Sequence, residues 1–460
     1  MTKLILLTVC LAASAFAESI LSTASDRTSL NITVYNGGRA LVQENRKISL
    51  REKNSVIRFE DVSSAVIPQS LIVVSQGGFR VLEQNYEFDL ISREKLLEKY
   101  VGKEVVLVDE DNIFGKQKRV KAKIVANNFQ PVFEVEGKIL LGFDGKILLE
   151  DIPENLYEKP TMNWLVQAQK TGDFTADVSY LTEGLSWNAD YVMVLADNDK
   201  SASIAGWITM TNNSGTSFEN ANLSLVAGDV NLVREDVRPI MMQRDALMSA
   251  GAPARGVEQR SFDEYHLYTV PNPVSINDRQ TKQIEMFSAD NIKTQKRYRV
   301  QSGSRNFRSN DDRLKVETEI IFETGKKNNL DLPIPRGVVR IYKKDGKNNV
   351  FLGEDNINHT PINEEVVLKS GDAFDITCFE KKVSERRINE NKWEYSKEIT
   401  VSNHKKENIT LLFDENISGN WTVKSDAKYK KINANTARFD INVGAGKTVV
   451  LKFTATIERL

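Results

Sequence analysis

The sequence predicts a mainly β protein in which several antiparallel β-sandwich or barrel modules follow one another in series, with little helix. The first observation is that apolar and polar residues alternate with period two in many short segments, which is typical of half-buried strands. The alternation is clearest near the C-terminal end, where one face of an expected strand carries Val449, Leu451, Phe453, Ala455 and Ile457. The second observation is turn chemistry between such segments, as at Asn36-Gly37-Gly38, Gln76-Gly77-Gly78, Asp144-Gly145, Asp345-Gly346 and Gly444-Ala445-Gly446. Short strands with frequent turns favour antiparallel sandwiches or barrels over a parallel sheet with crossover helices.

Residues 1–17 predict a secretory signal peptide. Lys3 supplies a positive start, residues 4–13 form a short apolar core, and Ala15-Phe16-Ala17 is a small-x-small cleavage site before Glu18. The apolar run is too short for a membrane span, and no later stretch reaches the roughly 18 apolar residues that a transmembrane segment needs. We therefore expect cleavage after Ala17 and a periplasmic or secreted protein with no transmembrane segment.

The two cysteines, Cys10 and Cys378, bear on processing and on redox chemistry. A lipoprotein signal would make Cys10 the lipidated first residue, but Val9 stands before it where a small residue is expected. With the signal peptide removed, only Cys378 remains, so no intrachain disulfide is predicted even in an oxidising compartment.

Composition excludes several classes of function. The 460 residues contain 62 basic and 63 acidic side chains, and a net charge of −1 gives no field that would attract nucleic acid or acidic membranes. Three histidines far apart, His266, His359 and His404, make a zinc or other transition-metal site unexpected. We predict no metal and no cofactor.

The order of patterns along the chain divides it into a signal peptide and four segments, within the range of about two to four domains that the length suggests. The second segment opens with the best helix candidate, Ser92 to Tyr100, in which Ser92 is placed to cap the helix. A stretch at about 238–256, rich in Met, Ala, Gly and Arg without periodicity, predicts a mobile loop. The expected ranges are 1–17 for the signal peptide, 18–91 for an N-terminal β-sandwich, 92–158 for a small module of a helix and a barrel-like sheet, 159–345 for a central β domain, and 346–460 for a C-terminal immunoglobulin-like sandwich.

Candidate binding residues are few. Glu264, His266 and Tyr268 would share one face of a strand at intervals of about 6.6 Å, which could form an acid/base or sugar-contacting row. A solvated strand face, or a histidine bonded to a neighbouring carbonyl, explains the same residues. Trp207 lies opposite the apolar face of its expected strand and could stack on a sugar ring, although packing between sheets is the commoner role of tryptophan.

Motifs for catalysis are not found. Residues 443–448 resemble the end of a phosphate-binding loop, but Ile441 stands where the motif requires glycine, and an alternating strand follows where a helix is required. We interpret these residues as a hairpin turn. No G-x-S-x-G elbow occurs, and a carboxylate pair for glycoside hydrolysis cannot be assigned from sequence because the separation of the two groups is three-dimensional.

Several blocks resemble a bacterial family, domain-of-unknown-function family 4139, some of whose members are labelled mucoidy inhibitor A. The blocks are residues 179–191, 206–215, 225–231, 265–268, 280–283, 333–337 and 371–375, and the hairpin at 32–42 is similar to the partner domain usually found ahead of that family. Many relatives carry a long coiled coil where residues 92–150 here predict a small β unit. The resemblance implies an architecture and an envelope location, and it carries over no catalytic or binding residues.

These observations predict a non-enzymatic, exported bacterial envelope protein that binds or scaffolds a surface protein or polysaccharide. Exposed sheet edges would allow strand addition as a binding mode. The alternative is a carboxylate-dependent hydrolase acting on envelope polysaccharide or peptide, with Glu264 and His266 as the candidate participants.

Overall fold

The computed structural model describes residues 18–87, 90–109, 118–153, 156–228, 258–262, 265–303 and 311–458. The predicted mainly β fold is confirmed, because strands gathered in several sheets make up most of this part of the chain. Its helices are short: α1 (Arg93–Lys99) and the 3-10 helices η1 (Ala24–Asp26), η2 (Pro68–Ser70) and η3 (Lys326–Asn328). The loop predicted at about 238–256 lies outside the described residues.

The described residues form two compact units, each composed of segments that are distant in sequence. The first unit comprises Met1–Ser186, Thr211–Ser224 and Asn272–Gln280, and the second comprises Trp187–Met210, Leu225–Pro271 and Thr281–Leu460. Residues 159–345, grouped above as one central segment, are thus divided between both units. The sequence ranges and the compact units are different partitions of the same chain.

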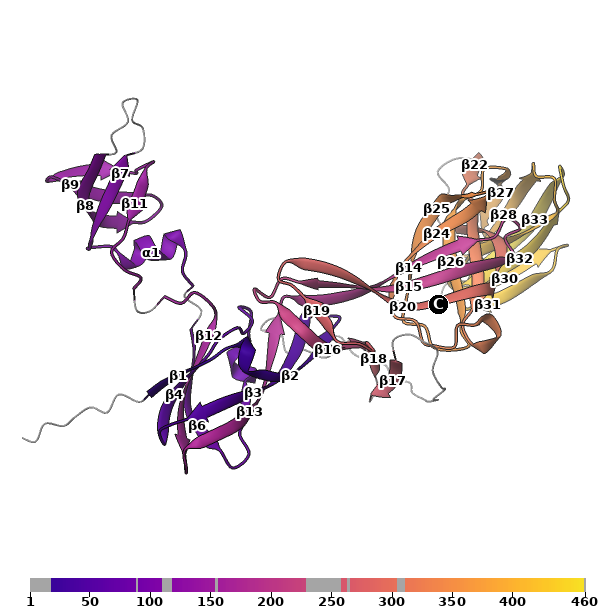
Figure 1. Cartoon of the computed structure of the whole chain (residues 1–460). Helices are drawn as coiled ribbons and strands as arrows, with labels where there is room; N and C mark the ends of the chain where they lie inside the picture. The colour runs from indigo at the N-terminus through magenta and orange to yellow at the C-terminus, as the bar shows by residue number, and fades with distance from the viewer. Residues whose placement is uncertain are drawn as a thin grey trace, which may run out of the picture. The chain divides into compact units, whose positions relative to one another are not determined.

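The first unit contains two main sheets (Figure 1). One has the order β1-β4-β12-β6 and consists of β1 (Glu18–Ser22), β4 (Asn54–Phe59), β12 (Thr161–Ala168) and β6 (Phe79–Glu87). The other is part of a larger sheet, and its strands that lie wholly or partly in this unit have the order β16-β2-β3-β13-β5. They are β16 (Phe218–Ala227), β2 (Arg27–Tyr35), β3 (Arg39–Leu50), β13 (Gly172–Glu183) and β5 (Ile72–Val74), with β19 (Val274–Ile276) paired to β16. The predicted hairpin at 32–42 is confirmed by the pairing of Ile32 with Val42.

The two sheets face each other across an apolar core. Phe59 of β4 stacks on Trp164 of β12 with ring centroids 4.6 Å apart. Phe79 of β6 meets Phe174 of β13 edge to face at 6.4 Å. Aromatic side chains from both sheets therefore close the layer between them.

Strand β3 departs from a purely apolar inner face. Its buried residues alternate as the period of a strand requires, and two of them, Glu44 and Arg46, are charged and fully buried. Arg46 lies over the Phe59 ring at 3.6 Å and donates to the carbonyl oxygens of Ser22 at 3.1 Å and Glu60 at 2.8 Å. This buried ion pair bears directly on the pocket described below.

A smaller module lies between β6 and β12 in sequence. Its sheet has the order β10-β9-β8-β7-β11, from β10 (Lys138–Leu141), β9 (Pro131–Val135), β8 (Lys118–Asn127), β7 (Glu104–Asp109) and β11 (Lys146–Leu148). The predicted helix is present as α1, and the side chain of Ser92 accepts a hydrogen bond from the Lys95 amide at 3.2 Å. Leu97 of α1 packs with the sheet residues Ile124 and Phe133 in one small core.

The second unit begins with a five-stranded sheet and a hairpin. The sheet has the order β20-β15-β14-β24-β25, from β20 (Gln280–Lys293), β15 (Ser201–Asn212), β14 (Leu185–Leu195), β24 (Gly337–Asp345) and β25 (Asn348–Ile357). The hairpin pairs β17 (Glu258–Phe262) with β18 (Tyr265–Thr269).

The rest of the second unit is a β-sandwich (Figure 1). One sheet has the order β26-β23-β21-β29-β32-β31, from β26 (Glu365–Asp372), β23 (Glu317–Glu323), β21 (Gln295–Gly303), β29 (Ile409–Asn416), β32 (Thr436–Val443) and β31 (Tyr429–Asn433). The other has the order β22-β27-β28-β33-β30, from β22 (Asp311–Leu314), β27 (Ile376–Arg387), β28 (Lys392–Asn403), β33 (Thr448–Glu458) and β30 (Asn420–Ser425). One hydrophobic core joins the two sheets, with Phe413, Phe439 and Phe453 at its centre.

The residues that resemble a phosphate-binding loop form a tight turn between strands. Gly446 has φ +63°, and the Lys447 amide donates to the Gly444 carbonyl at 3.1 Å. The strand β33 follows, as the alternation predicts. However, β32 and β33 belong to different sheets, so the turn connects the two layers of the sandwich and is not the predicted hairpin turn.

Candidate functional site

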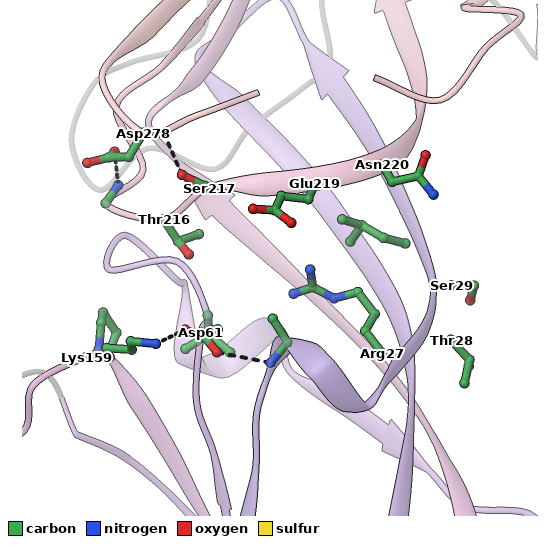
Figure 2. A pocket seen from close by; sticks show the side chains of 15 residues that line it. Arg27, Thr28, Ser29, Asp61, Lys159, Thr216, Ser217, Glu219, Asn220 and Asp278 are labelled. Carbon is green, nitrogen blue, oxygen red and sulfur yellow. Dashed lines mark hydrogen bonds and ion pairs between the residues drawn. The ribbon is translucent and has the colours of Figure 1, made fainter. Parts of the chain in front are cut away.

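The first unit contains a pocket of about 540 Å³, within the size range of small-ligand sites. Its wall is formed by η1 and the start of β2, by the chain after β4, by Lys159 before β12, and by the turn that leads into β16. Figure 2 shows that charged side chains from these segments, among them Arg27, Asp61, Lys159 and Glu219, gather around the same space. The pocket is therefore polar and carries both signs of charge.

Asp61 ties three of these segments together. It has φ +60°, the left-handed conformation that aspartate tolerates better than most residues. Its carboxylate accepts from the Ala24 amide at 3.0 Å and from Lys159 Nζ at 2.7 Å. Since Thr23 and Asp26 form a capping box around η1, the position of Ala24 is itself fixed. The wall of the pocket is thus held by hydrogen bonds within the first unit.

The opposite wall is the turn between Asn212 and β16. Asp278 accepts from the Gly215 amide at 2.9 Å, and the Asp278 amide donates to Ser217 Oγ at 3.0 Å. Gly215 has φ +80°, and a Cβ atom built there would lie 2.0 Å from Ser64 Oγ, so only glycine fits. Asn212, fully buried, donates to the carbonyl oxygens of Thr216 and Ile276. These contacts define the turn without any ligand.

Arg27 contributes the most deeply buried cation of the pocket. Its side chain is 9 % exposed, and its Nε atom donates to Glu44, which is fully buried and also pairs with Arg46. Among the described residues, only this Nε atom of Arg27 has a hydrogen-bond partner. Figure 2 shows the end of the guanidinium group directed into the pocket, with the Glu219 carboxylate on the same side. Two terminal nitrogens are therefore presented to a ligand by a side chain whose orientation Glu44 fixes.

The charges of the pocket favour recognition over proton transfer. Burial acts to raise the pKa of Asp61, but hydrogen bonds from Lys159 and the Ala24 amide outweigh it and hold that pKa below its usual value. The same hydrogen bond raises the pKa of Lys159. Asp61 is an anion and Lys159 a cation at neutral pH, so neither is poised to act as a general acid or base.

The residues singled out from the sequence lie elsewhere, in the second unit. Glu264 lies outside the described residues. His266 and Tyr268 are both on β18, and Trp207 is half-buried on the outer face of β15 with Thr209. Partial burial lowers the pKa of His266 below its ordinary 6.5, so its imidazole is neutral at neutral pH. The structure brings His266 and Tyr268 onto one strand and places Trp207 on a separate strand.

Tyr268 is part of the packed core of the second unit. It is 1 % exposed, its hydroxyl donates to the Pro333 carbonyl at 3.1 Å, and its ring lies 6.4 Å from that of Trp187. A ligand in solvent cannot reach this hydroxyl without moving the core around it.

We expect Tyr268→Phe to lower the free energy of unfolding of the second unit by about 1–2 kcal/mol, because the buried Pro333 carbonyl loses its donor. Hydrogen exchange of β18 and β24 peptides would measure this loss. Tyr265→Phe, at a half-buried position on the same strand, is the matched control and should be close to neutral. Unchanged exchange together with loss of envelope binding would instead assign Tyr268 to a binding site.

Sequence reasoning missed Arg27, Asp61, Lys159 and Asp278. They are spread along the chain between positions 27 and 278, and only the strand order of the first unit brings them to one place. One feature of the sequence could have pointed to these residues. Glu44 occupies an inward position between the apolar residues Val42 and Ile48, and a charge there requires a buried partner.

No family model matches the chain, and no curated protein matches it. Within the described ranges, no cluster of three or more His, Cys, Asp or Glu side chains is arranged to hold a metal ion. Across the same residues, no helix has the length and hydropathy to cross a membrane.

Proposed function

We propose that the chain is an exported bacterial envelope protein that acts by binding and not by catalysis, and that the pocket of the first unit holds part of an envelope polysaccharide. The signal-peptide pattern of residues 1–17 and the resemblance to family 4139 support export and an envelope location. The observation that carries the binding role is Arg27, whose terminal nitrogens face a preformed polar pocket while Glu44 holds its Nε atom.

The chemistry of the wall favours a glycan that carries carboxylates. The edge of a guanidinium group can form two parallel hydrogen bonds with a carboxylate. A lysine ammonium lacks this planar geometry and fits a carboxylate less well. The hydroxyls of Thr28, Ser29, Thr216 and Ser217 and the carboxylate of Glu219 suit sugar hydroxyls, which both donate and accept. An acidic polysaccharide presents both kinds of group along one chain. A surface protein with an exposed acidic side chain is the other partner that the binding role allows.

The test uses Arg27→Lys, which keeps the positive charge beside Glu44 and removes the planar fork. Isothermal titration of the protein beginning at Glu18 with purified acidic envelope polysaccharide should show affinity reduced about ten- to hundredfold, the loss expected for hydrogen bonds to a charged group. Arg80→Lys, an exposed position on β6 outside the pocket, is the matched control and should bind as the unsubstituted protein does.

Two results would contradict this proposal. Equal affinity of Arg27→Lys and Arg80→Lys would remove the pocket from binding. Release of reducing ends from the polysaccharide by the unsubstituted protein would favour the alternative function, a carboxylate-dependent hydrolase. If the unsubstituted protein does not bind the polysaccharide in this titration, the glycan is not the partner, and a surface protein is the partner that the binding role still allows.

A further inference from the structure

A lysine is buried between the two sheets of the sandwich in the second unit. Lys397 of β28 has a side chain with no exposed surface. Its Nζ atom lies 2.8 and 3.1 Å from the two carboxylate oxygens of Glu415 on β29, and 3.0 Å from Oε1 of Glu380 on β27. Both carboxylates are themselves buried, with Glu415 fully so. One amine thus faces two carboxyl groups inside an apolar core.

The surroundings exclude water and supply further hydrogen bonds. Tyr395 donates to Glu415 Oε1 at 2.8 Å, and Ser302 contacts both Glu380 and the Lys397 Nζ atom, the latter at 3.1 Å. Phe413 and Phe453 belong to the hydrophobic core between the same two sheets. Such a site strengthens every electrostatic interaction within it and holds the groups in fixed geometry.

The charges of this cluster do not balance. Two carboxylates and one ammonium carry one excess negative charge, and burial of an unpaired charge is costly. Burial raises the pKa of Glu415, and the nearby Glu380 adds to this, although Lys397 and Tyr395 act in the opposite direction. Amide formation needs the acid form of Glu415, which a raised pKa favours, and a second carboxyl group near Nζ to take the ammonium proton, which Glu380 provides at 3.0 Å.

We propose that Lys397 and Glu415 join through an intramolecular amide bond, with Glu380 as the proton carrier. The ammonium proton of Lys397 passes to Glu380, and the Nζ lone pair attacks Cδ of the protonated Glu415 carboxyl group. The tetrahedral intermediate, whose oxygen accepts from Tyr395, loses its hydroxyl as water with the proton returned by Glu380. Glu380 then takes the second proton from the nitrogen and ends as a neutral carboxylic acid. One C–N bond forms, one C–O bond breaks, and one water molecule leaves, with no oxidation or reduction.

The approach requires only a small rearrangement. Lys397 now lies near both oxygens of Glu415, so its Nζ atom faces the edge of the carboxyl group, whereas attack requires the flat face. The terminal torsion of glutamate is soft, and rotation about it turns that face toward Nζ without moving either strand. The Nζ atom already lies 2.8 and 3.1 Å from the two oxygens bonded to the carbon that it would attack.

The bond would connect the two layers of the sandwich. Lys397 belongs to the sheet of β27, β28 and β33, and Glu415 to the sheet of β21, β29 and β32. Cys378, the only cysteine beyond residues 1–17, is buried and unpaired, so no disulfide joins these layers. An amide link performs the same mechanical role and is insensitive to reductant.

The test is the mass of the full chain, measured on denatured protein. We expect a mass lower than the sequence mass by one water molecule, and a proteolytic fragment in which the peptide containing Lys397 is joined to the peptide containing Glu415. The exposed pair Lys452 and Glu398, 3.0 Å apart on neighbouring strands β33 and β28, is the internal control and should stay unlinked. A mass equal to the sequence mass after prolonged incubation of folded protein, or a bond to Glu380 in place of Glu415, would overturn the proposal.

Two variants separate the chemistry from folding. Lys397→Met removes the nucleophile and should restore the full sequence mass. Glu380→Gln keeps the shape and hydrogen bonding at that position but accepts no proton, so the folded variant should form the bond at least tenfold more slowly. Bond formation in Glu380→Gln at the rate of the unsubstituted chain would contradict the role of Glu380 as proton carrier.

Discussion

Glu44→Gln should lower the free energy of unfolding of the first unit by about 3–5 kcal/mol, the range found when one member of a buried ion pair is removed. Glu44 is the anion between Arg27 and Arg46, and Arg46 is completely buried against Phe59. Burial already lowers the pKa of Arg46, with Glu44 the main influence that opposes it. A neutral amide at position 44 would leave that guanidinium group without a counter-charge.

Hydrogen exchange of β3 and β4 peptides in urea would measure this loss for the first unit by itself, since a chain of two units need not unfold in one step. Glu52→Gln, exposed after β3, is the matched control and should stay within about 0.5 kcal/mol of the unsubstituted protein. The double variant Glu44→Gln with Arg46→Met removes both charges and should recover part of the stability. A small loss in Glu44→Gln, no greater than in Glu52→Gln, would mean that the ion pair does not hold the sheets together.

The sequence predicts individual strands well because alternation is a local property. The strand at 449–457 is present as β33, and its inward residues Leu451, Phe453 and Ala455 are all buried. The hairpin at 32–42 and the capped helix at 93–99 follow from turn and capping chemistry over a few residues. In each case the physical cause lies within one strand, one turn or one helix end.

Strand order is not a local property, and no local sequence pattern specifies it. β12 enters the first sheet between β4 and β6, although the small module at 92–150 separates it from β6 in the chain. β1 pairs in parallel with β4, a partner that no turn specifies. Because the pocket around Arg27 exists only once these partners meet, sequence patterns could not place it.

Charged residues at inward strand positions are the signal that sequence reasoning could have used. In β28, Tyr395, Lys397, Ile399 and Val401 share the buried face, and in β29 Glu415 follows Leu411 and Phe413 at the same spacing of two. β3 has the same pattern at Glu44 and Arg46. A charge within an otherwise apolar face must be paired to be buried, so each such position predicts a buried partner of opposite charge. The identity of that partner still requires the fold.

Lys397→Met should destabilise the second unit in a way that depends on pH, and the direction of that dependence follows from Glu415. The variant leaves Glu415 and Glu380 buried without a cation, and we expect a loss of about 3–5 kcal/mol near neutral pH from the unpaired charges alone. The folded state raises the pKa of Glu415 above its ordinary 4.5, and removal of Lys397 takes away the main group that lowers it. Between the unfolded and the folded pKa, the folded state therefore binds more protons than the unfolded state, and stability falls as pH rises through that window.

Urea unfolding followed by exchange of β28 and β29 peptides should show Lys397→Met more stable at about pH 5 than at about pH 8, with a steeper decline than the unsubstituted protein. Lys452→Met, which removes an exposed partner of Glu398, is the matched control and should show a small loss without that slope. A flat pH profile for Lys397→Met would mean that its buried carboxyl groups reach solvent or another cation, and the closed, water-free cluster that the amide bond requires would then be excluded.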